Sequence, residues 1–290
     1  MPSPLQPPVQ GHAHADWLRP QWPAPPGVHA LCTTRAGGVS TGPYASLNLG
    51  SHVGDEPAAV QANRQILQAA VQGASPRARS VFLNQVHDTS VVMLDRSTPD
   101  GTEADACVAT QPGAVCTILV ADCLPVLLAH QSGTVVGAAH AGWRGLAGQG
   151  GWGVLEAVFD RFSALALVGH AQAAIKKEAV DQIATHTMAW LGPCIGPSAF
   201  EVGAEVREAF CAHLPAAQAC FAAQGGGKYL ADLAALARLR LRALGITQIY
   251  GNDSSAPWCT VGNASRFFSY RRDQRTLGGS GRMAACIWRG

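Results

Sequence analysis

The stretch VADCLPVLLAHQSGTVVGAAHAGWRG, residues 120–145, decides the fold of this chain. Two short apolar runs, 115–121 and 134–139, are bounded by turn residues and rich in β-branched side chains, so each predicts a buried strand. Between them, 124–129 predicts a further strand, and the Gln-Ser-Gly segment 131–133 predicts the turn that follows it. The short spacing of these segments favours a sheet that is antiparallel or mixed.

Reactive side chains stand where these predicted strands end. Cys123 follows the first apolar run and His140 follows the second. His87 ends an earlier apolar segment, 80–86. A buried strand holds the residue at its end rigidly, while the side chain can still reach a cleft. We therefore expect Cys123 and His140 to face one cavity, with His87 as a third candidate.

His87, Cys123 and His140 together predict a metal site. Two imidazoles and one thiolate are good zinc ligands, and three protein ligands leave a fourth position open, as in catalytic zinc sites. A second interpretation is a cysteine nucleophile that is activated by a histidine base. The spacing matches no local metal motif, and free cysteine is common in protein cores, so three unrelated buried residues stay a third interpretation.

Charged residues interrupt the same apolar stretch. Asp122 precedes Cys123, and Arg144 follows His140. Buried charges need partners, so these two are expected to pair with each other or to contact a ligand. Because Asp122 is next to Cys123, it is also the candidate general acid or base of the site.

A glycine-rich loop follows the predicted strand 28–34. Its paired glycines allow positive φ or the close approach of another group to the backbone. The loop lacks the spacing of the known phosphate loops, so a plain turn is the alternative. Arginine supplies a planar fork of donors that suits phosphate oxygens. The predicted phosphate- or substrate-binding residues are therefore Arg35, Gly37, Gly38, Asn48 and Arg144.

The composition is that of a globular chain with an ample core. Of the 290 residues, 48% are hydrophobic and 14% are charged. The 21 basic and 19 acidic residues give a net charge of +2, without any block of like charges, which argues against a nucleic-acid partner. The local cluster of Arg266, Arg271 and Arg272 suits a small anionic ligand better than a duplex.

Cysteine usage predicts a reducing compartment. The nine cysteines are odd in number and form no CxxC pair. Residues 1–30 contain no apolar segment typical of a signal peptide, and no run reaches the ~18 apolar residues of a membrane span. We therefore expect a cytoplasmic protein with free thiols and no membrane partner.

The remaining pattern predicts one domain, 17–290, after a Pro-rich, disordered tail, 1–16. The tail contains the HxH pair His12 and His14, which has no preorganised partners and is expected to be solvated. Further helices are predicted at 57–73, 146–163, 204–213 and 229–244, and 164–186 is helical in pattern. Further strands are predicted at 80–86, 90–94, 104–109, 188–195, 246–250 and 283–288.

Seven motifs carry a resemblance to a known family. They are TTRAGGVSTGPYASLNLG (33–50), VGDEPAAVQANR (53–64), LNQVH (83–87), ADCLPVLL (121–128), AAHAGWRG (138–145), GPCIGPSAFEVG (192–203) and SYRRDQRTLGGSGR (269–282). With these motifs, from about residue 17 to its end, the chain resembles the bacterial laccase-domain, or polyphenol oxidase-like, proteins. Members of that family are described as purine nucleoside phosphorylases with adenosine deaminase activity, and related members as peptidoglycan editing factors.

The resemblance implies a fold, a metal and a reaction. The implied fold is an α/β layered sandwich with mixed β-sheets and outer helices in a single domain. The implied zinc ligands are His87, Cys123 and His140. The implied reaction is phosphorolysis of adenosine, inosine, guanosine or methylthioadenosine to base and ribose 1-phosphate, with deamination of adenosine. The expected partners are therefore a small nucleoside and phosphate, bound by a monomer or a homodimer.

Two other functions stay open. One is a Cys-His amidase that acts on a misassembled peptidoglycan precursor, as the editing-factor description implies. The other is a copper polyphenol oxidase, with copper in place of zinc. Multicopper oxidases need several HxH pairs, and this chain has one, in its tail, so copper is the weaker alternative.

Overall fold

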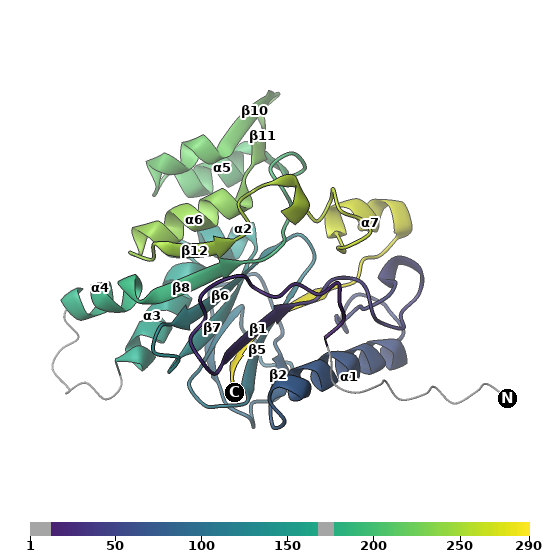
Figure 1. The fold of residues 1–290 in the computed structure, drawn as a ribbon. Coiled ribbons are helices and arrows are strands. Elements are labelled where there is room, and N and C mark those ends of the chain that lie inside the picture. The colour runs from purple at the N-terminus through teal and green to yellow at the C-terminus, as the bar shows by residue number, and fades with distance from the viewer. Residues whose placement is uncertain (1–12, 168–176) are drawn as a thin grey trace.

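Two β-sheets form the centre of the fold in the computed structural model, which describes residues 13–167 and 177–290 (Figure 1). The six-stranded sheet has the order β12-β8-β6-β7-β4-β3. Its strands are β3 (Val91–Leu94), β4 (Ala106–Ala109), β6 (Leu124–His130), β7 (Val136–Ala141), β8 (Thr187–Leu191) and β12 (Gln248–Gly251). The four-stranded sheet has the order β1-β13-β5-β2, with strands β1 (Val28–Cys32), β2 (Arg79–Phe82), β5 (Ala114–Val120) and β13 (Met283–Arg289).

Both sheets are mixed, as predicted. The pairs β2 with β5, β3 with β4, and β8 with β12 are parallel, and the other neighbours in these two sheets are antiparallel. The predicted turn at 131–133 joins β6 to β7 in an antiparallel hairpin. That prediction is therefore confirmed.

The two sheets pack face to face through a shared apolar core. Along β5, the side chains of Cys116, Ile118 and Val120 belong to this core. Val115 and Leu119 belong to a second core on the opposite face of the same sheet. Side chains alternate between the faces of a strand, so a strand buried on both faces has an unbroken apolar sequence.

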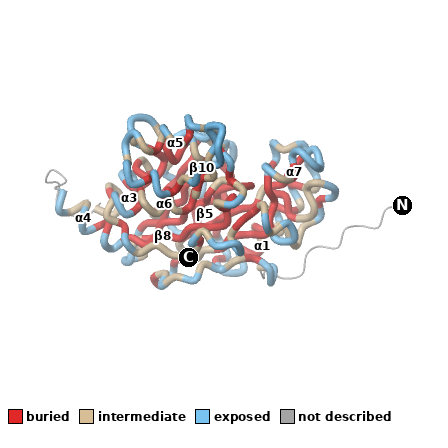
Figure 2. The backbone as a smooth tube through the Cα atoms, turned by 90° about the horizontal axis from the view of Figure 1, so that it is seen from above, coloured by how far each residue is buried: buried red, intermediate tan, exposed pale blue. Residues whose placement is uncertain are grey.

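Helices cover the outer face of each sheet (Figure 1). α1 (Pro57–Ala74) buries Leu67 and Val71 against the four-stranded sheet. α3 (Val154–Ala166) and α6 (Leu233–Ala243) cover the six-stranded sheet. Figure 2 shows buried segments through the middle of the molecule and exposed residues on its outer surface. The expected α/β layered sandwich with outer helices is confirmed.

A third sheet of three strands packs beside α5 (Ala204–Cys211). Its order is β10-β11-β9, with β9 (Glu201–Gly203), β10 (Phe221–Gly225) and β11 (Lys228–Ala231). β11 corrects the predicted helix 229–244, because these residues pair with strands on both sides. α6 begins after Asp232, whose carboxylate accepts a hydrogen bond from the Ala235 amide at 2.8 Å and caps the helix.

Glycines also correct the predicted helix 146–163, which is two helices. α2 (Trp143–Ala147) ends at Gly148, and α3 begins at Val154. Gly148, Gly150 and Gly151 all adopt positive φ, and a helix cannot continue through them. Of the segment 164–186, α3 takes the beginning and α4 (Lys177–Thr185) the end, while 168–176 lie outside the described residues.

The remaining elements are short. α7 (Tyr270–Leu277) and the 3-10 helices η1 (Gly42–Tyr44), η2 (Pro215–Cys220) and η3 (Ala256–Trp258) were not predicted, since none offers a long apolar stripe. In the tail, His12 lies outside the described residues, whereas the ring of His14 lies close against Gly37. Among the described residues, every helix is too short or too polar to cross a bilayer.

Candidate functional site

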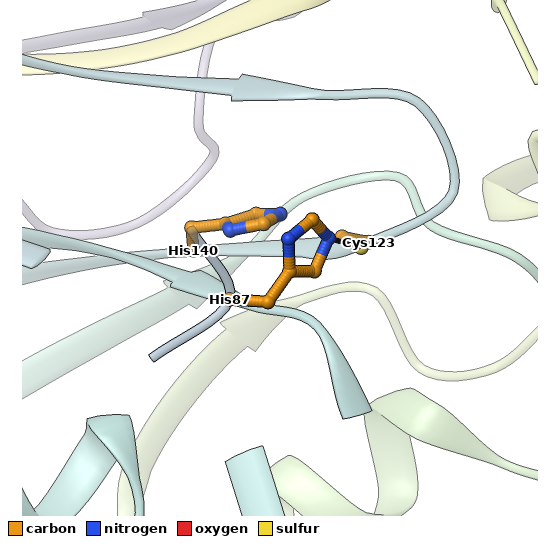
Figure 3. Close-up of side chains that lie close together, drawn as sticks. All are labelled: His87, Cys123 and His140. Atoms are coloured by element: carbon orange, nitrogen blue, oxygen red, sulfur yellow. Dashed lines mark hydrogen bonds between the residues drawn. The ribbon is translucent and has the colours of Figure 1, made fainter. Parts of the chain in front are cut away.

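His87, Cys123 and His140 come together at one end of the two sheets (Figure 3). His87 lies in the loop after β2, Cys123 lies between β5 and β6, and His140 lies on β7. One ligand atom from each residue lies within 4.8 Å of those of the other two. The Cys123 Sγ and His87 Nε2 atoms are 3.8 Å apart. The structure therefore brings together the three residues that the sequence predicted as one site.

A buried carboxylate, Asp105, fixes the geometry of two of these residues. Its Oδ1 accepts a hydrogen bond from His140 Nδ1 at 2.8 Å, which leaves His140 Nε2 free to face the cluster. The same carboxylate accepts hydrogen bonds from the backbone amides of Val86, His87 and Asp88 at 2.8–2.9 Å. Burial raises the pKa of Asp105, but these hydrogen bonds more than offset it, so the pKa lies below the ordinary value.

The backbone around the cluster is strained and crowded. His87 and Asp122 adopt φ of 65° and 88°, a region that non-glycine residues rarely occupy. A Cβ atom at Gly142 would lie 3.0 Å from both Cys123 Sγ and His87 Cδ2. A Cβ atom at Gly145 would lie 2.8 Å from the carbonyl oxygen of Asp88. The glycines of the AGWRG motif thus allow the His87 loop to approach β7 and α2.

The electrostatics of the cluster favour a thiolate. Burial raises the pKa of Cys123, but His140 and His87 together lower it to about 6. Burial lowers the pKa of His140, but Cys123 and Asp105 raise it to about 9. Cys123 and His140 therefore form a thiolate–imidazolium pair near neutral pH when no metal is bound. The thiolate is the form of cysteine that binds metals and acts as a nucleophile.

The three residues fit a metal ion. In a tetrahedral zinc site, metal–ligand lengths of about 2.3 Å for sulfur and about 2.0 Å for nitrogen place these donors roughly 3.5 Å apart. The observed separation of 3.8 Å between Cys123 Sγ and His87 Nε2 is close to that value. Metal-binding histidines usually donate their second nitrogen to a carboxylate, as His140 does to Asp105.

A cavity of about 530 Å³, here called the site cavity, opens on the cluster. This volume is in the range of about 300–1,000 Å³ that small-molecule sites occupy. Its wall combines apolar and aromatic side chains with several cationic ones. The lining residues that complete the site beyond the cluster are His52, Leu83, Gln85, Leu119, Ala121, Asp122, Trp143, Arg144, Ile195, Phe200, Leu233, Tyr270, Arg271 and Arg282.

Two other hollows help to define the site. The outer hollow, about 630 Å³, shares His87, Trp143 and Arg144 with the site cavity and continues along the exposed Trp152. A larger hollow of about 830 Å³ lies between α1 and β2 and contains no residue of the cluster. Chemistry rather than volume therefore identifies the site cavity as the candidate active site.

Asp122 and Arg144 both line the site cavity, but they do not pair with each other. The Asp122 carboxylate accepts hydrogen bonds from Thr260 Oγ1 at 2.5 Å, Ser269 Oγ at 3.1 Å and the Arg271 amide at 2.6 Å. The exposed Arg144 guanidinium lies over the Trp143 ring, 4.5 Å from its centroid. The first expectation, that the two residues pair, is thus corrected, because donors from residues 260–271 occupy the carboxylate. The alternative, that each contacts a ligand, stays a prediction. The acid or base role of Asp122 stays a prediction.

The other predicted phosphate residues lie outside the wall of the site cavity. Arg35 donates to the carbonyl oxygens of Ala45 and Ala264, both at 2.8 Å. Gly38 packs against the Ser46–Leu47 backbone and Gly37 against His14. Asn48 Oδ1 accepts hydrogen bonds from the amides of Gly50 and Arg282. These contacts hold the loop in place, and Asn48 positions the backbone of a cavity residue.

Sequence reasoning missed several residues of the site. Asp105 follows Ala104 and precedes the apolar run of β4, so an isolated acid in an apolar segment was the available signal. Arg282, His52 and Tyr270 come from loops distant in the sequence, and no local pattern indicates that they meet. Of the basic cluster near the C-terminus, Arg271 reaches the site cavity, and Arg272 pairs with Asp273.

Comparison with known proteins places the chain among relatives of similar length. It is 45% identical over 273 residues to the purine nucleoside phosphorylase PA4543 of Pseudomonas aeruginosa. The matched region covers 94% of this chain and 98% of that protein. It is 47% identical over 269 residues to the purine nucleoside phosphorylase YfiH of Escherichia coli. The matched region covers 93% of this chain and 97% of that protein.

Solved structures agree with this placement. The crystal structure of NMB0706 of Neisseria meningitidis is similar with a TM-score of 0.79 and 43% identity, over 94% of this chain and 99% of that one. The crystal structure of YlmD of Geobacillus stearothermophilus is similar with a TM-score of 0.77 and 31% identity, over 97% of this chain and 99% of that one. Residues 29–290 match the family described as multi-copper polyphenol oxidoreductase laccase, and the chain belongs to that family.

Proposed function

We propose that this chain is a zinc-dependent purine nucleoside phosphorylase that also deaminates adenosine. Its substrates are adenosine, inosine, guanosine and methylthioadenosine, which it converts with phosphate to the free base and ribose 1-phosphate. The observation that carries the proposal is the His87–Cys123–His140 cluster, which faces a cavity of small-molecule size. Relatives that are 45–48% identical and named purine nucleoside phosphorylases support the reaction.

Zinc suits this donor set better than copper does. His87, Cys123 and His140 would hold the ion, and Asp105 would orient His140. Zinc supplies a Lewis acid and can lower the pKa of water, which deamination at C6 of the purine requires. A multicopper oxidase needs several metal clusters, and residues 13–167 and 177–290 contain one group of this kind. Copper at that single group is the weaker alternative.

The walls of the site cavity suit a purine nucleoside. Phe200 and Tyr270 offer aromatic surfaces to a flat base, and Leu83, Leu119 and Ile195 exclude water around it. During phosphorolysis the sugar gains positive charge as the base leaves, and an anionic phosphate held near C1′ stabilises that charge. Of the phosphate-binding residues that the sequence predicted, we propose Arg144, on the open side of the cavity, as a phosphate ligand.

Adenosine tests the proposal directly. With the zinc-loaded protein and phosphate, chromatography should show adenine and ribose 1-phosphate. Without phosphate it should show at most inosine. Cys123→Ala should remove both the bound zinc and the activity, whereas Cys211→Ala, which removes a thiol on α5, should retain both. Full zinc occupancy in the Cys123 variant, or the absence of both adenine and inosine with the native protein, would contradict the proposal.

A Cys-His amidase is the second candidate function. Cys123 suits the role of nucleophile, and His87 lies close to it as a base. Asp105, which orients His140, suits the role of orienting carboxylate. The outer hollow gives room for a substrate larger than a nucleoside. This function predicts that a peptidoglycan precursor with a wrong first amino acid is cleaved and that activity survives removal of the metal by a chelator. If removal of the metal by a chelator also removes all activity, the amidase function is excluded.

A further inference from the structure

Arg282 is a cation in the wall of the site cavity with no acidic partner. Its Nη1 donates to the carbonyl oxygens of Ser280 at 2.8 Å and Gly281 at 3.1 Å. Within residues 13–167 and 177–290, no carboxylate lies within 4.0 Å of the guanidinium, and its Nε and Nη2 make no hydrogen bond. Arg282 is partly buried, and this burial lowers the pKa of its guanidinium. Donors left free on such a cation suit an anionic ligand.

The fold holds this guanidinium in place. The Arg282 amide donates to Asn48 Oδ1 at 2.8 Å. The side chain packs against Gly50, where a Cβ atom would be 2.7 Å from Arg282 Cγ. The guanidinium carbon lies 5.7 Å from the centroid of the Tyr270 ring. Contacts with Asn48, Gly50 and Tyr270 therefore hold Arg282 in the wall of the site cavity, and such preorganisation suits an oxyanion site.

His52 adds a second donor on the same wall. It lines the site cavity, and its imidazole has no hydrogen-bond partner in the part of the chain that the structure describes. Burial, together with the charge of Arg282, lowers the pKa of His52, and both residues line the same cavity as His87. Asp122 is the one carboxylate among the described lining residues, and its oxygens are occupied by Thr260, Ser269 and Arg271. Three arginines of this lining, Arg144, Arg271 and Arg282, thus outnumber its one carboxylate.

We propose that inorganic phosphate binds to Arg282 and His52, beside the His87–Cys123–His140 cluster. Arg282 contributes a fork of two donors, and neutral His52 contributes one. Arg282 and His52 line the same cavity as the three residues of the cluster, so the subsite and the cluster share one cavity. Arg144, which is exposed, would contact the phosphate from the open side.

The role of this phosphate as a reactant rests on the proposed phosphorolysis. An oxygen of HPO₄²⁻ bonds to C1′ while the C1′–N9 bond breaks and its electron pair moves to the base. The proton of the phosphate is transferred, directly or through water, to the leaving purine. The products are ribose 1-phosphate and the neutral base, so atoms and charge balance. Arg282 keeps the nucleophile at the site until the nucleoside is bound.

Calorimetric titration of the zinc-loaded protein with potassium phosphate tests the subsite. Arg282→Gln and His52→Ala should each weaken phosphate binding by about 10- to 100-fold, as expected when hydrogen bonds to a charged group are lost. Arg282→Lys should restore part of the affinity. Arg275→Gln, at an exposed position of α7 outside the cavity, is the matched control and should bind phosphate as the native protein does. Zinc content and melting temperature verify that each variant is folded, and His52→Ala, at an exposed position, serves if Arg282→Gln does not fold.

The outcomes separate this subsite from the function. Unchanged phosphate affinity in folded Arg282→Gln and His52→Ala overturns the subsite, even if phosphorolysis occurs. Phosphate binding that depends on these residues, without any release of purine base, supports the subsite while the proposed function fails. A parallel titration with adenosine 5′-monophosphate identifies the source of the anion. If the variants weaken binding of the nucleotide but not of inorganic phosphate, the subsite belongs to a nucleotide and the proposal is overturned.

Discussion

The carboxylate of Asp105 accepts a hydrogen bond from His140 Nδ1 at 2.8 Å, and both side chains are buried. Three backbone amides of the loop at 86–88 donate to the same carboxylate. A single acidic side chain therefore orients one residue of the cluster and fixes the loop that carries another. The expected consequences can be measured in metal binding as well as in stability.

Replacing Asp105 with asparagine should weaken metal binding without removing a ligand. The amide NH₂ would face groups that are all donors, so at least one hydrogen bond would be lost. We expect metal affinity to fall by about 10- to 100-fold and the free energy of unfolding to fall by about 1–3 kcal/mol. Competition with a chromophoric chelator measures the affinity, and Asp100→Asn, at a partly exposed ion pair, is the control. Unchanged affinity would mean that His140 needs no orienting group.

Gly142→Ala should disturb the cluster through steric crowding. Its φ of −66° suits alanine, so the backbone is not strained by the change. The new Cβ would lie 3.0 Å from both Cys123 Sγ and His87 Cδ2, and the exposed His87 would have to move. We expect weaker metal binding and little change in melting temperature. Gly262→Ala, where the nearest atom would lie at 3.8 Å, is the matched control. Equal metal affinity in the two variants would contradict the prediction.

Arg35→Lys and Arg144→Lys should affect different properties. Arg35 donates to two carbonyl oxygens and lies over the buried Phe268 ring, so lysine should lower the free energy of unfolding by about 1–3 kcal/mol. The KM for phosphate should stay unchanged. Arg144→Lys should raise the KM for phosphate more than the KM for nucleoside, because lysine lacks the planar fork. Steady-state kinetics and denaturant titration distinguish the two, and a raised phosphate KM in the Arg35 variant would reverse these roles.

Asp122→Asn distinguishes a positioning role from an acid or base role. The carboxylate accepts three hydrogen bonds from the segment at 260–271, so the amide should destabilise this wall of the cavity. For a positioning residue we expect a lower melting temperature and a raised KM for nucleoside, with a pH–rate profile of unchanged shape. Loss of one limb of that profile would instead identify Asp122 as the acid or base.

His29 should make stability sensitive to mildly acidic pH. Its ring stacks on Trp288 with centroids 5.4 Å apart, and burial lowers its pKa. The unfolded chain therefore takes up a proton near pH 6.5, before the folded protein does. The contribution of His29 is complete above about pH 6.5 and is lost as the pH falls toward the folded pKa. The decrease in melting temperature from pH 7.5 to 5 should be smaller in His29→Gln than in the native protein, with His213→Gln as an exposed control.

The strands and the types of ligand residue could be predicted from the sequence. The unbroken apolar runs around β5 and β7 reflect burial on both faces, and this property is visible in a short window of sequence. Cys123 and His140 could be placed at the ends of those strands for the same reason. Helix boundaries were harder to predict from the sequence. The apolar pattern of α6 continues by chance through β11, and the positive φ at Gly148 cannot be predicted from periodicity.

The residues that complete the site become apparent in the folded structure. Asp105, Arg282 and His52 lie far apart in the sequence, and their convergence depends on strand register and on loops that cross the ends of both sheets. Asp122 does not pair with Arg144, because its carboxylate accepts hydrogen bonds from three donors in residues 260–271. Residue types and local periods are properties of short segments, whereas the partner of a buried charge is chosen by whichever distant donors the packed fold brings within hydrogen-bond distance.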